Sequence, residues 1–460
     1  MNKTTNNTLV IRVCFIAALA GLLFGLDIAY VNGALEFIAR DFNLTEDQSQ
    51  QIAGVLLAGA AVGALFSGWL SRMFGRKKIL VLAAFIFTIF TLAGILSHNI
   101  NTFLVTRFIL GIAIGIASFV APLYLSEIAP YKIRGGLIAM YQLMITIGIL
   151  LMFVSNASLH STGSWRIMLA VLLIPSAIML IGTLTLPESP RWLVLVGRGQ
   201  EAENVLTKIR STKAEVDFEI SEIKESIVGA KSGFKLLNHP YFLKVLLLGV
   251  LLQGLQQFSG MNAFMYYSSK IFMEAGIDNP AVATMIVGLV NVLTTFLAIK
   301  YVDKLGRKPI LYFGLMLLIA SCAVSGYIFH LQSTGVILNT TLQYTLLCFC
   351  LLFIFAFAIS LGPIVWIICA EIYPLEGRDL GITVSTMANW IFNAIIGSYT
   401  LTWFKNLGVS GTFWLFGGAC ILGVILVNRF TPETKDVTLE ELEFNLKANK
   451  KLRDLGEHTN

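Results

Sequence analysis

Two charged residues, Asp27 and Arg107, stand inside long apolar stretches in the first half of this 460-residue chain. A single charge inside a membrane costs at least about 2.5 kcal/mol, so each residue is expected to need a partner, and each is the obvious partner of the other. One hypothesis is that Asp27 takes up and releases a proton as its surroundings change. The competing hypothesis is a permanent ion pair that only fixes helix packing.

Short charged motifs recur where apolar stretches end, and they occur twice in the same order. The letters FGRK at 74–77 match LGRK at 305–308, SEIAP at 126–130 matches AEIYP at 370–374, and PES at 187–189 matches PET at 432–434. The spacing from Glu127 to Glu188 is 61 residues, and that from Glu371 to Glu433 is 62. Such order and spacing indicate an internal repeat of the whole half.

These motifs place carboxylates and guanidinium groups together, which predicts ion pairs between the two halves that close one side of the protein while the other side is open. The competing hypothesis is that the charges only mark where each span stops. The expected gate pairs are Glu127 with Arg134, Glu188 with Arg191, and Glu371 with Arg378, with Arg76, Arg307 and Glu433 nearby.

The residues that could do this chemistry must be positioned by membrane helices. The chain is 56% hydrophobic and 13% charged, whereas soluble domains carry about a quarter charged residues. Stretches such as 79–97, 136–154 and 344–365 have no charge and are long enough to cross a hydrocarbon core of about 30 Å. About twelve such spans are expected. Basic residues fall mainly in every second connection, which predicts that both termini are cytoplasmic.

The long hydrophilic stretch near the middle of the chain divides it into parts. We expect a six-helix half at 1–190, a cytoplasmic helical linker at 191–240, a second six-helix half at 241–432 and a cytoplasmic tail at 433–460. The fold class is therefore an all-α membrane protein with twelve transmembrane helices in two parallel halves. In this architecture a site near the middle of the membrane opens to each side in turn.

The ordered motifs resemble the sugar porter family of the major facilitator superfamily, and within it the bacterial galactose–proton and arabinose–proton symporters. The resemblance spans the whole chain and rests on 18–27 (ALAGLLFGLD), 122–130 (PLYLSEIAP), 141–148 (YQLMITIG), 187–192 (PESPRW), 256–262 (QQFSGMN) and 432–435 (PETK). It implies proton-coupled uptake of a monosaccharide such as galactose, glucose or arabinose across the inner membrane. It also implies that Asp27, with Arg107, couples the proton, because facilitators of the family generally carry a neutral residue there.

The resemblance further implies which neutral side chains hold the sugar, since amides both donate and accept hydrogen bonds as sugar hydroxyls do. The implied contacts are Gln142, Gln256, Gln257, Asn262, Tyr266, Asn291 and Asn389, with Trp366 and Trp390 as flat apolar faces. The alternative for any single amide is a bond between helices.

The seventh span is predicted to contain a break. Asn262 and Tyr266 are four residues apart and share a helix face, but Gln256 lies about 240° around an ideal helix from Asn262. Ser259 and Gly260 are therefore expected to interrupt the helix, as happens where transporters bind their ligands.

Other functions are disfavoured by the sequence. It shows no nucleophile with a base, no phosphate-binding loop and no cysteine or histidine spacing of a metal site, so no enzyme activity, metal or cofactor is expected beyond the coupling proton. The tail is too short for a signalling sensor, and the dispersed basic residues do not suggest nucleic-acid binding. The expected partners are a monosaccharide, protons and membrane lipid, with the chain working as a monomer. Facilitated diffusion of sugar without protons remains the alternative.

Overall fold

The computed structural model describes residues 7–128, 134–210, 212–229, 233–435, 437 and 439–457, and the regular structure in these ranges is helical. The first half holds α1 (Asn7–Phe42), α2 (Glu46–Phe74), α3 (Arg76–Ile95), α4 (Ile100–Ile128), α5 (Arg134–Leu159), α6 (Trp165–Ala170) and α7 (Leu173–Leu184). The second half holds α11 (Pro240–Phe258), α12 (Met261–Glu274), α13 (Pro280–Leu305), α14 (Arg307–Ser333), α15 (Thr340–Ile359), α16 (Leu361–Glu371) and α17 (Arg378–Phe430).

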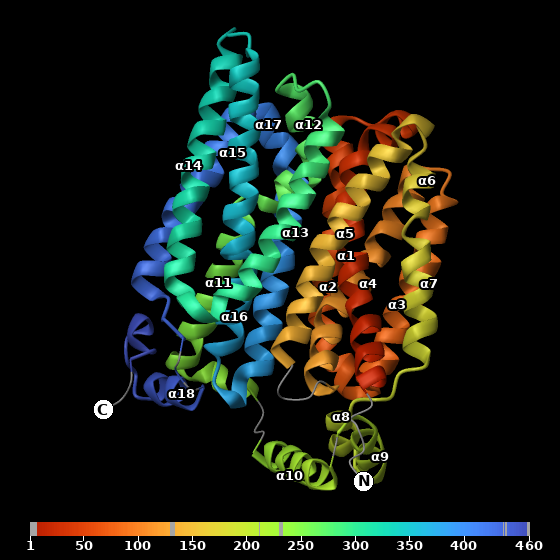
Figure 1. Cartoon of the computed structure of the whole chain (residues 1–460), viewed down its shortest axis with the longest axis vertical. Helices are drawn as coiled ribbons and strands as arrows, with labels where there is room; N and C mark the ends of the chain where they lie inside the picture. Colours follow the sequence, from red (N-terminus) through yellow and green to blue (C-terminus); the bar gives the residue numbers. More distant parts are fainter. Residues whose placement is uncertain are drawn as a thin grey trace.

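The two halves stand side by side, and the short helices between them lie beyond one end of the bundle (Figure 1). We call this end the linker side and the opposite end the far side. The linker contains α8 (Pro190–Leu195), α9 (Gly199–Ile209), α10 (Lys213–Gly229) and a 3₁₀ turn, η3 (Gly233–Asn238). After the second half come α18 (Leu439–Lys447) and a 3₁₀ turn, η5 (Leu452–Asp454), and two further 3₁₀ turns are η2 (His160–Thr162) and η4 (Leu375–Gly377).

The chain crosses the membrane twelve times. Within the described residues, eleven helical segments are long and apolar enough to span, and one of them is the 53-residue α17. A single helix of that length would measure about 80 Å, far more than the roughly 30 Å of a hydrocarbon core. Gly408 interrupts α17 with a φ of 71°, so this segment is two spans and the total is twelve. Six lie on each side of the linker, which confirms the expected fold.

Two spans of the second half are broken near their middle. Gly260 separates α11 from α12 with a φ of 91°, which confirms the break predicted for the seventh span. A side chain there would also collide with Phe416, since a Cβ would lie 2.3 Å from its ring. The tenth span breaks at Ser360, between α15 and α16, which the uncharged stretch did not reveal.

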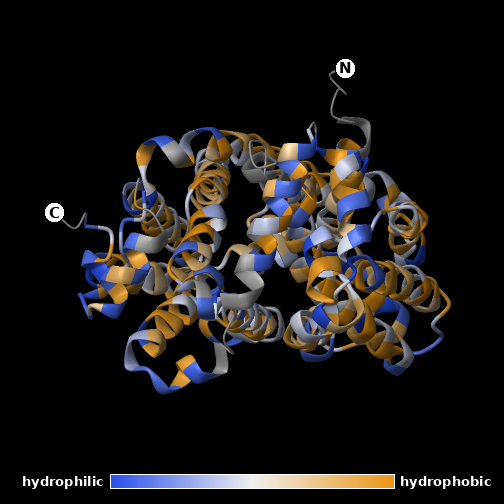
Figure 2. Cartoon of the chain, turned by 90° about the horizontal axis from the view of Figure 1, so that it is seen from below, coloured by the Kyte–Doolittle hydropathy of each residue, from blue (hydrophilic) through white to orange (hydrophobic). Residues whose placement is uncertain are grey.

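Close helix packing follows from small residues. A Cβ added to Gly59 of α2 would lie 2.1 Å from the carbonyl oxygen of Phe108, and one added to Gly111 of α4 would lie 1.9 Å from that of Leu56. Only glycine permits this approach of backbones, as is common between membrane helices. Figure 2 shows the two halves from the linker side as two lobes with hydrophobic residues along the helices of both. A binding site between the halves would therefore be lined by helices of both lobes.

Candidate functional site

The predicted pairing of Asp27 with Arg107 is confirmed. Arg107 Nη1 of α4 lies 2.5 Å from Asp27 Oδ1 of α1, and both side chains are fully buried. The pair uses one oxygen and one nitrogen only. Asp27 Oδ2 and the Nε and Nη2 of Arg107 have no hydrogen-bond partner in the described part of the chain. A carboxylate with one free oxygen in a closed site can accept a proton without losing another hydrogen bond.

Amide side chains of α11, α12 and α17 form a connected network. Asn389 Nδ2 donates to Gln253 Oε1 and to Gln256 Oε1, both at 2.7 Å. Gln257 Nε2 donates to Gln256 Oε1 at 3.3 Å, and Asn262 Nδ2 donates to Gln257 Oε1 at 2.6 Å. All of these side chains are buried except that of Asn262, which is half-buried at one end of the network. We call these five residues the amide cluster.

The two broken spans meet at Gln256. This residue lies in the last turn of α11, and its Nε2 donates to the carbonyl oxygens of Leu361 at 2.8 Å and Gly362 at 3.1 Å, at the start of α16. Together with the two bonds that its oxygen accepts, Gln256 uses all four hydrogen bonds that a glutamine amide can make. A sugar hydroxyl that binds Gln256 must therefore take the place of one of these bonds.

Contacts across the two halves connect the amide cluster to the ion pair. The ring of Trp390, next to Asn389 on α17, lies 5.1 Å from that of Phe24, which is one helical turn before Asp27. On α12, Tyr266 donates from its hydroxyl to Asn393 Oδ1 at 3.1 Å. The charges of Asp27 and Arg107 are close enough to act on Tyr266. The expected proton site and the expected sugar site are thus neighbours.

Apart from Tyr266 and Trp390, three of the implied sugar contacts lie outside the amide cluster, and no side-chain bond joins them to it in the described residues. Gln142 is half-buried on α5, Asn291 is buried on α13, and Trp366 of α16 is 37% exposed. Their roles remain predictions. The sequence reading missed Gln253 and Asn393. A signal was present, because Gln253 lies three residues before Gln256 and Asn393 four after Asn389, which places each on the same helix face as an implied contact.

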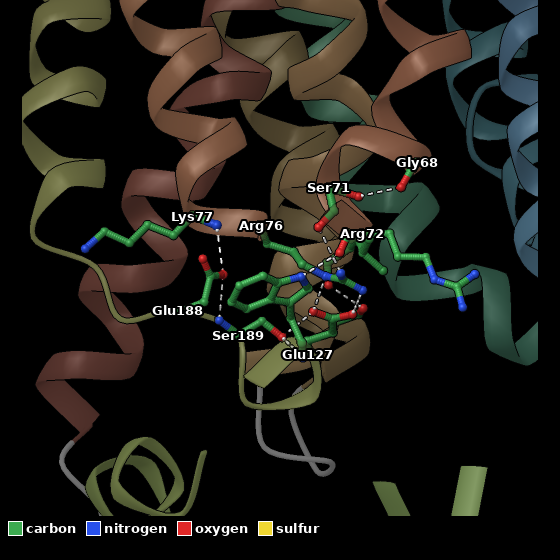
Figure 3. Close-up of polar contacts among 11 residues, drawn as sticks. Gly68, Ser71, Arg72, Arg76, Lys77, Glu127, Glu188 and Ser189 are labelled. Carbon is green, nitrogen blue, oxygen red and sulfur yellow. Dashed lines mark hydrogen bonds and ion pairs between the residues drawn. The ribbon is translucent and has the colours of Figure 1, made fainter. Parts of the chain in front are cut away.

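The charged motifs of the first half form a compact set of bonds at the linker side (Figure 3). Arg76 makes a bidentate pair with Glu127, with Nε to Oε2 at 2.9 Å and Nη2 to Oε1 at 2.8 Å. The hydroxyl of Ser189 donates to Glu127. Glu188 Oε1 accepts from the backbone N–H of Lys77 at 3.0 Å and of Ser189 at 2.9 Å. A carboxylate is favoured there because it meets the N-terminus of α3.

The second half repeats this arrangement in space. Arg307 Nη2 donates to Glu371 Oε1 at 2.8 Å, and Thr434 Oγ1 donates to Glu371 Oε2 at 2.5 Å. Glu433 accepts from the backbone N–H of Arg307 and of Lys308, both at 2.9 Å. The internal repeat read from the motifs is therefore present in three dimensions. We call each set of bonds a carboxylate seat.

The expected gate pairs need correction. In this structure Glu127 and Glu371 pair with Arg76 and Arg307 of their own half. The physical reason is that each glutamate ends a span directly beside the first turn of a helix in the same half. Pairs between the halves were expected when the linker side is closed and the far side open, and that part stays a prediction. The partner expected for Glu127 was Arg134, which begins α5 and whose side chain lies outside the described residues.

The other two predicted gate arginines were expected to pair with neighbouring glutamates. Arg378 Nη2 donates to the carbonyl oxygen of Tyr373 at 3.4 Å, and Arg191 lies exposed on α8. Glu188, the partner expected for Arg191, is instead bound by backbone N–H groups of 77 and 189.

Replacing Gly75 with alanine is expected to destabilise the first carboxylate seat. Gly75 has a φ of 98°, and a Cβ there would lie 2.3 Å from Glu188 Oε2. Gly197 is the matched control, since its φ is 80° but a Cβ would meet nothing within 4 Å. Both variants put a side chain at a positive φ, which costs about 1–3 kcal/mol, but only Gly75→Ala also displaces Glu188. A thermal melt of the purified protein should fall further for Gly75→Ala, and equal melting points would contradict the seat.

Polar contacts between the halves gather at the far side. Asn32 Nδ2 of α1 donates to the carbonyl oxygen of Met265 and to Ser268 Oγ of α12, both at 2.9 Å, and its Oδ1 accepts from Ser269 at 2.6 Å. Lys270 Nζ pairs with Glu46 at 2.5 Å. These contacts hold α12, which carries Asn262 and Tyr266, against the first half.

Comparison with known proteins agrees with this geometry. A family model described as "Sugar (and other) transporter" matches residues 13–446. The galactose-proton symporter of Escherichia coli strain K12 is 47% identical over 99% of this chain and 98% of that protein. The arabinose-proton symporter of the same strain is 43% identical over 96% of this chain and 94% of that protein.

Solved structures of the proton:xylose symporter XylE share the fold. The structure bound to 6-bromo-6-deoxy-D-glucose has a TM-score of 0.80 and 32% identity, and the match covers 96% of this chain and 99% of that chain. The inward-open structure from E. coli has a TM-score of 0.79 and 31% identity, with 95% and 99% covered.

Proposed function

Because the chain belongs to the Sugar (and other) transporter family, we propose that it carries a monosaccharide across the membrane together with a proton. The observation that carries the proposal is the buried, singly bonded Asp27–Arg107 pair beside a network of neutral amides. The amides match sugar hydroxyls, and the carboxylate supplies a group suited to carry a proton.

The proposed cycle uses both features. Protonation of Asp27 removes its charge, which weakens the attraction to Arg107 on α4 and lets α1 move relative to α4. Because Phe24 of α1 contacts Trp390, this movement reaches the amide cluster that holds the sugar. Release of the proton on the opposite side restores the ion pair. Binding of the sugar and binding of the proton thus both shift the equilibrium between the same two orientations of the halves.

The substrate is proposed to be galactose, glucose or arabinose, following the sugars named for the similar symporters. We place the chain in the inner membrane with the linker and both termini in the cytoplasm, on the positive-inside distribution of its basic residues. In that orientation, the far-side contacts of Asn32 would join the two halves at the outer end of the protein. The protein is proposed to act as a monomer in lipid, as a carrier without a cofactor and not as an enzyme.

The test is uptake by proteoliposomes with a panel of galactose, glucose, arabinose and xylose. An external pH indicator should report alkalinisation on addition of the transported sugar, because protons enter with it. Sugar uptake that proceeds only down its gradient, without any pH change, would instead support facilitated diffusion. Liposomes without protein supply the baseline for leak of protons and sugar.

A further inference from the structure

The ring of Tyr30 lies over the charged end of Arg107. The guanidinium carbon of Arg107 is 5.4 Å from the centre of the Tyr30 ring, and both side chains are fully buried. Tyr30 follows Asp27 by three residues on α1, so the carboxylate and the ring project from the same face of the helix toward one guanidinium. Arg107 therefore has two partners on α1, of which one is charged and the other is not.

The uncharged partner matters when Asp27 is protonated. Arg107 then loses its ion pair while it remains inside the membrane, and its Nε and Nη2 have no hydrogen-bond partner in the described structure to compensate. The face of an aromatic ring attracts a desolvated cation. When Asp27 is neutral, its carboxyl no longer competes for the guanidinium, so the Tyr30 ring holds that cation more strongly than when Asp27 is charged. This difference favours the protonated form of the site relative to a site without the ring.

The other charged and titratable groups around this site are few. The charge of Arg166 of α6 interacts electrostatically with Tyr30, and the charges of Asp27 and Arg107 interact with Tyr266 of α12. Tyr141 of α5 packs beside Gly21, about two turns of α1 away from Asp27. The hydroxyl of Tyr30 makes only a long bond, 3.5 Å to the carbonyl oxygen of Trp165. The ring, and not the hydroxyl, is thus the part of Tyr30 that faces the ion pair.

We propose that Tyr30 is a positioning residue of the proton-coupling site, whose ring holds the Arg107 guanidinium when Asp27 is protonated and so sets the pH range in which the carrier takes up protons. This inference rests on the proposed symport. Tyr30 is not among the residues that the sequence predicts to couple the proton.

The test compares Tyr30→Leu with Tyr30→Phe in the full-length protein in proteoliposomes, across a range of pH. Tyr30→Leu should move the midpoint of sugar-driven proton uptake to lower pH by about one unit, a roughly tenfold loss of proton affinity. Tyr30→Phe keeps the ring and should retain the wild-type midpoint. Exchange of labelled sugar at equal concentrations on both sides, which needs no net proton movement, should change by less than about twofold in both.

Several outcomes would overturn the inference. A wild-type midpoint for Tyr30→Leu would show that the ring does not act on the pair, and an equal shift for Tyr30→Phe would assign the effect to the hydroxyl. If Tyr30→Leu does not fold, Tyr30→Met offers an unbranched replacement of adaptable shape. Tyr124→Leu removes another fully buried tyrosine, from α4, and should not move the midpoint. Absence of sugar-driven proton movement in the wild type would instead reject the proposed function itself.

Discussion

Replacing Asp27 with asparagine is expected to abolish uphill sugar accumulation and sugar-driven proton uptake while leaving exchange of sugar across the membrane. Asparagine keeps the size of the side chain and its bond to Arg107 but cannot take up a proton. A membrane potential of about 120 mV is worth about 2.8 kcal/mol per charge, which sustains roughly a 100-fold gradient. The accumulation ratio of the variant should therefore fall from about this value to about 1.

The measurement is the steady-state ratio of labelled sugar inside and outside energised vesicles, together with exchange in the absence of a proton gradient. Asp41→Asn is the matched control. Asp41 lies on the same helix, at the far side, where its half-exposed carboxylate binds Trp165 and Arg166. This variant should still accumulate sugar. Unchanged accumulation by Asp27→Asn would remove Asp27 from the proton path, and loss of exchange as well would point to a structural role for the pair.

Replacing Gln256 with alanine is expected to weaken sugar binding strongly. The change removes one of the two bonds that Asn389 donates, leaves Gln257 Nε2 without its partner, and removes a side-chain bond from each of the carbonyl oxygens of Leu361 and Gly362. A buried polar group without a partner costs about 1–3 kcal/mol, so disruption of the cluster together with loss of any direct sugar contact should lower affinity by roughly 10- to 100-fold or more.

Isothermal titration of the purified protein with the transported sugar measures this loss. Gln343→Ala is the matched control, because Gln343 donates to the carbonyl oxygen of Gly276 in a far-side loop. Its affinity should equal that of the wild type. Wild-type affinity in Gln256→Ala would exclude this residue from the sugar site and would show that the amide cluster serves only to join α11, α16 and α17.

Much of the architecture can be predicted from short stretches of the sequence. The uncharged stretches predict the twelve spans. Gln256 and Asn262 would lie on different faces of an unbroken helix, so a shared role for them predicts the break at Gly260. The Asp27–Arg107 pair is equally predictable, since two lone charges in lipid must find each other. The break at Ser360 left no such signal, because the stretch around it is uniformly apolar.

Partners at the linker side are harder to read from the sequence. Motif neighbours such as Glu127 and Arg134 are close along the chain, which suggested that they pair. The observed partner, Arg76, is 51 residues away and becomes close only because the end of α4 meets the start of α3. The same limit applies to Gln142, Asn291 and Trp366, whose distances from a sugar depend on how the two halves are set against each other.

The carboxylate seats give each half its own ion pair, Arg76 with Glu127 in one and Arg307 with Glu371 in the other. A rotation of one half against the other leaves these pairs intact. What such a rotation breaks at the far side includes a few neutral bonds around Asn32 and the partly exposed ion pair of Lys270 with Glu46, and water can replace both when the entrance opens. Each exchange of this kind changes the free energy by only about 1 kcal/mol. The polar bonds that must break at the far side are therefore few and weak, so that binding of sugar or a proton can bias the change between the two orientations.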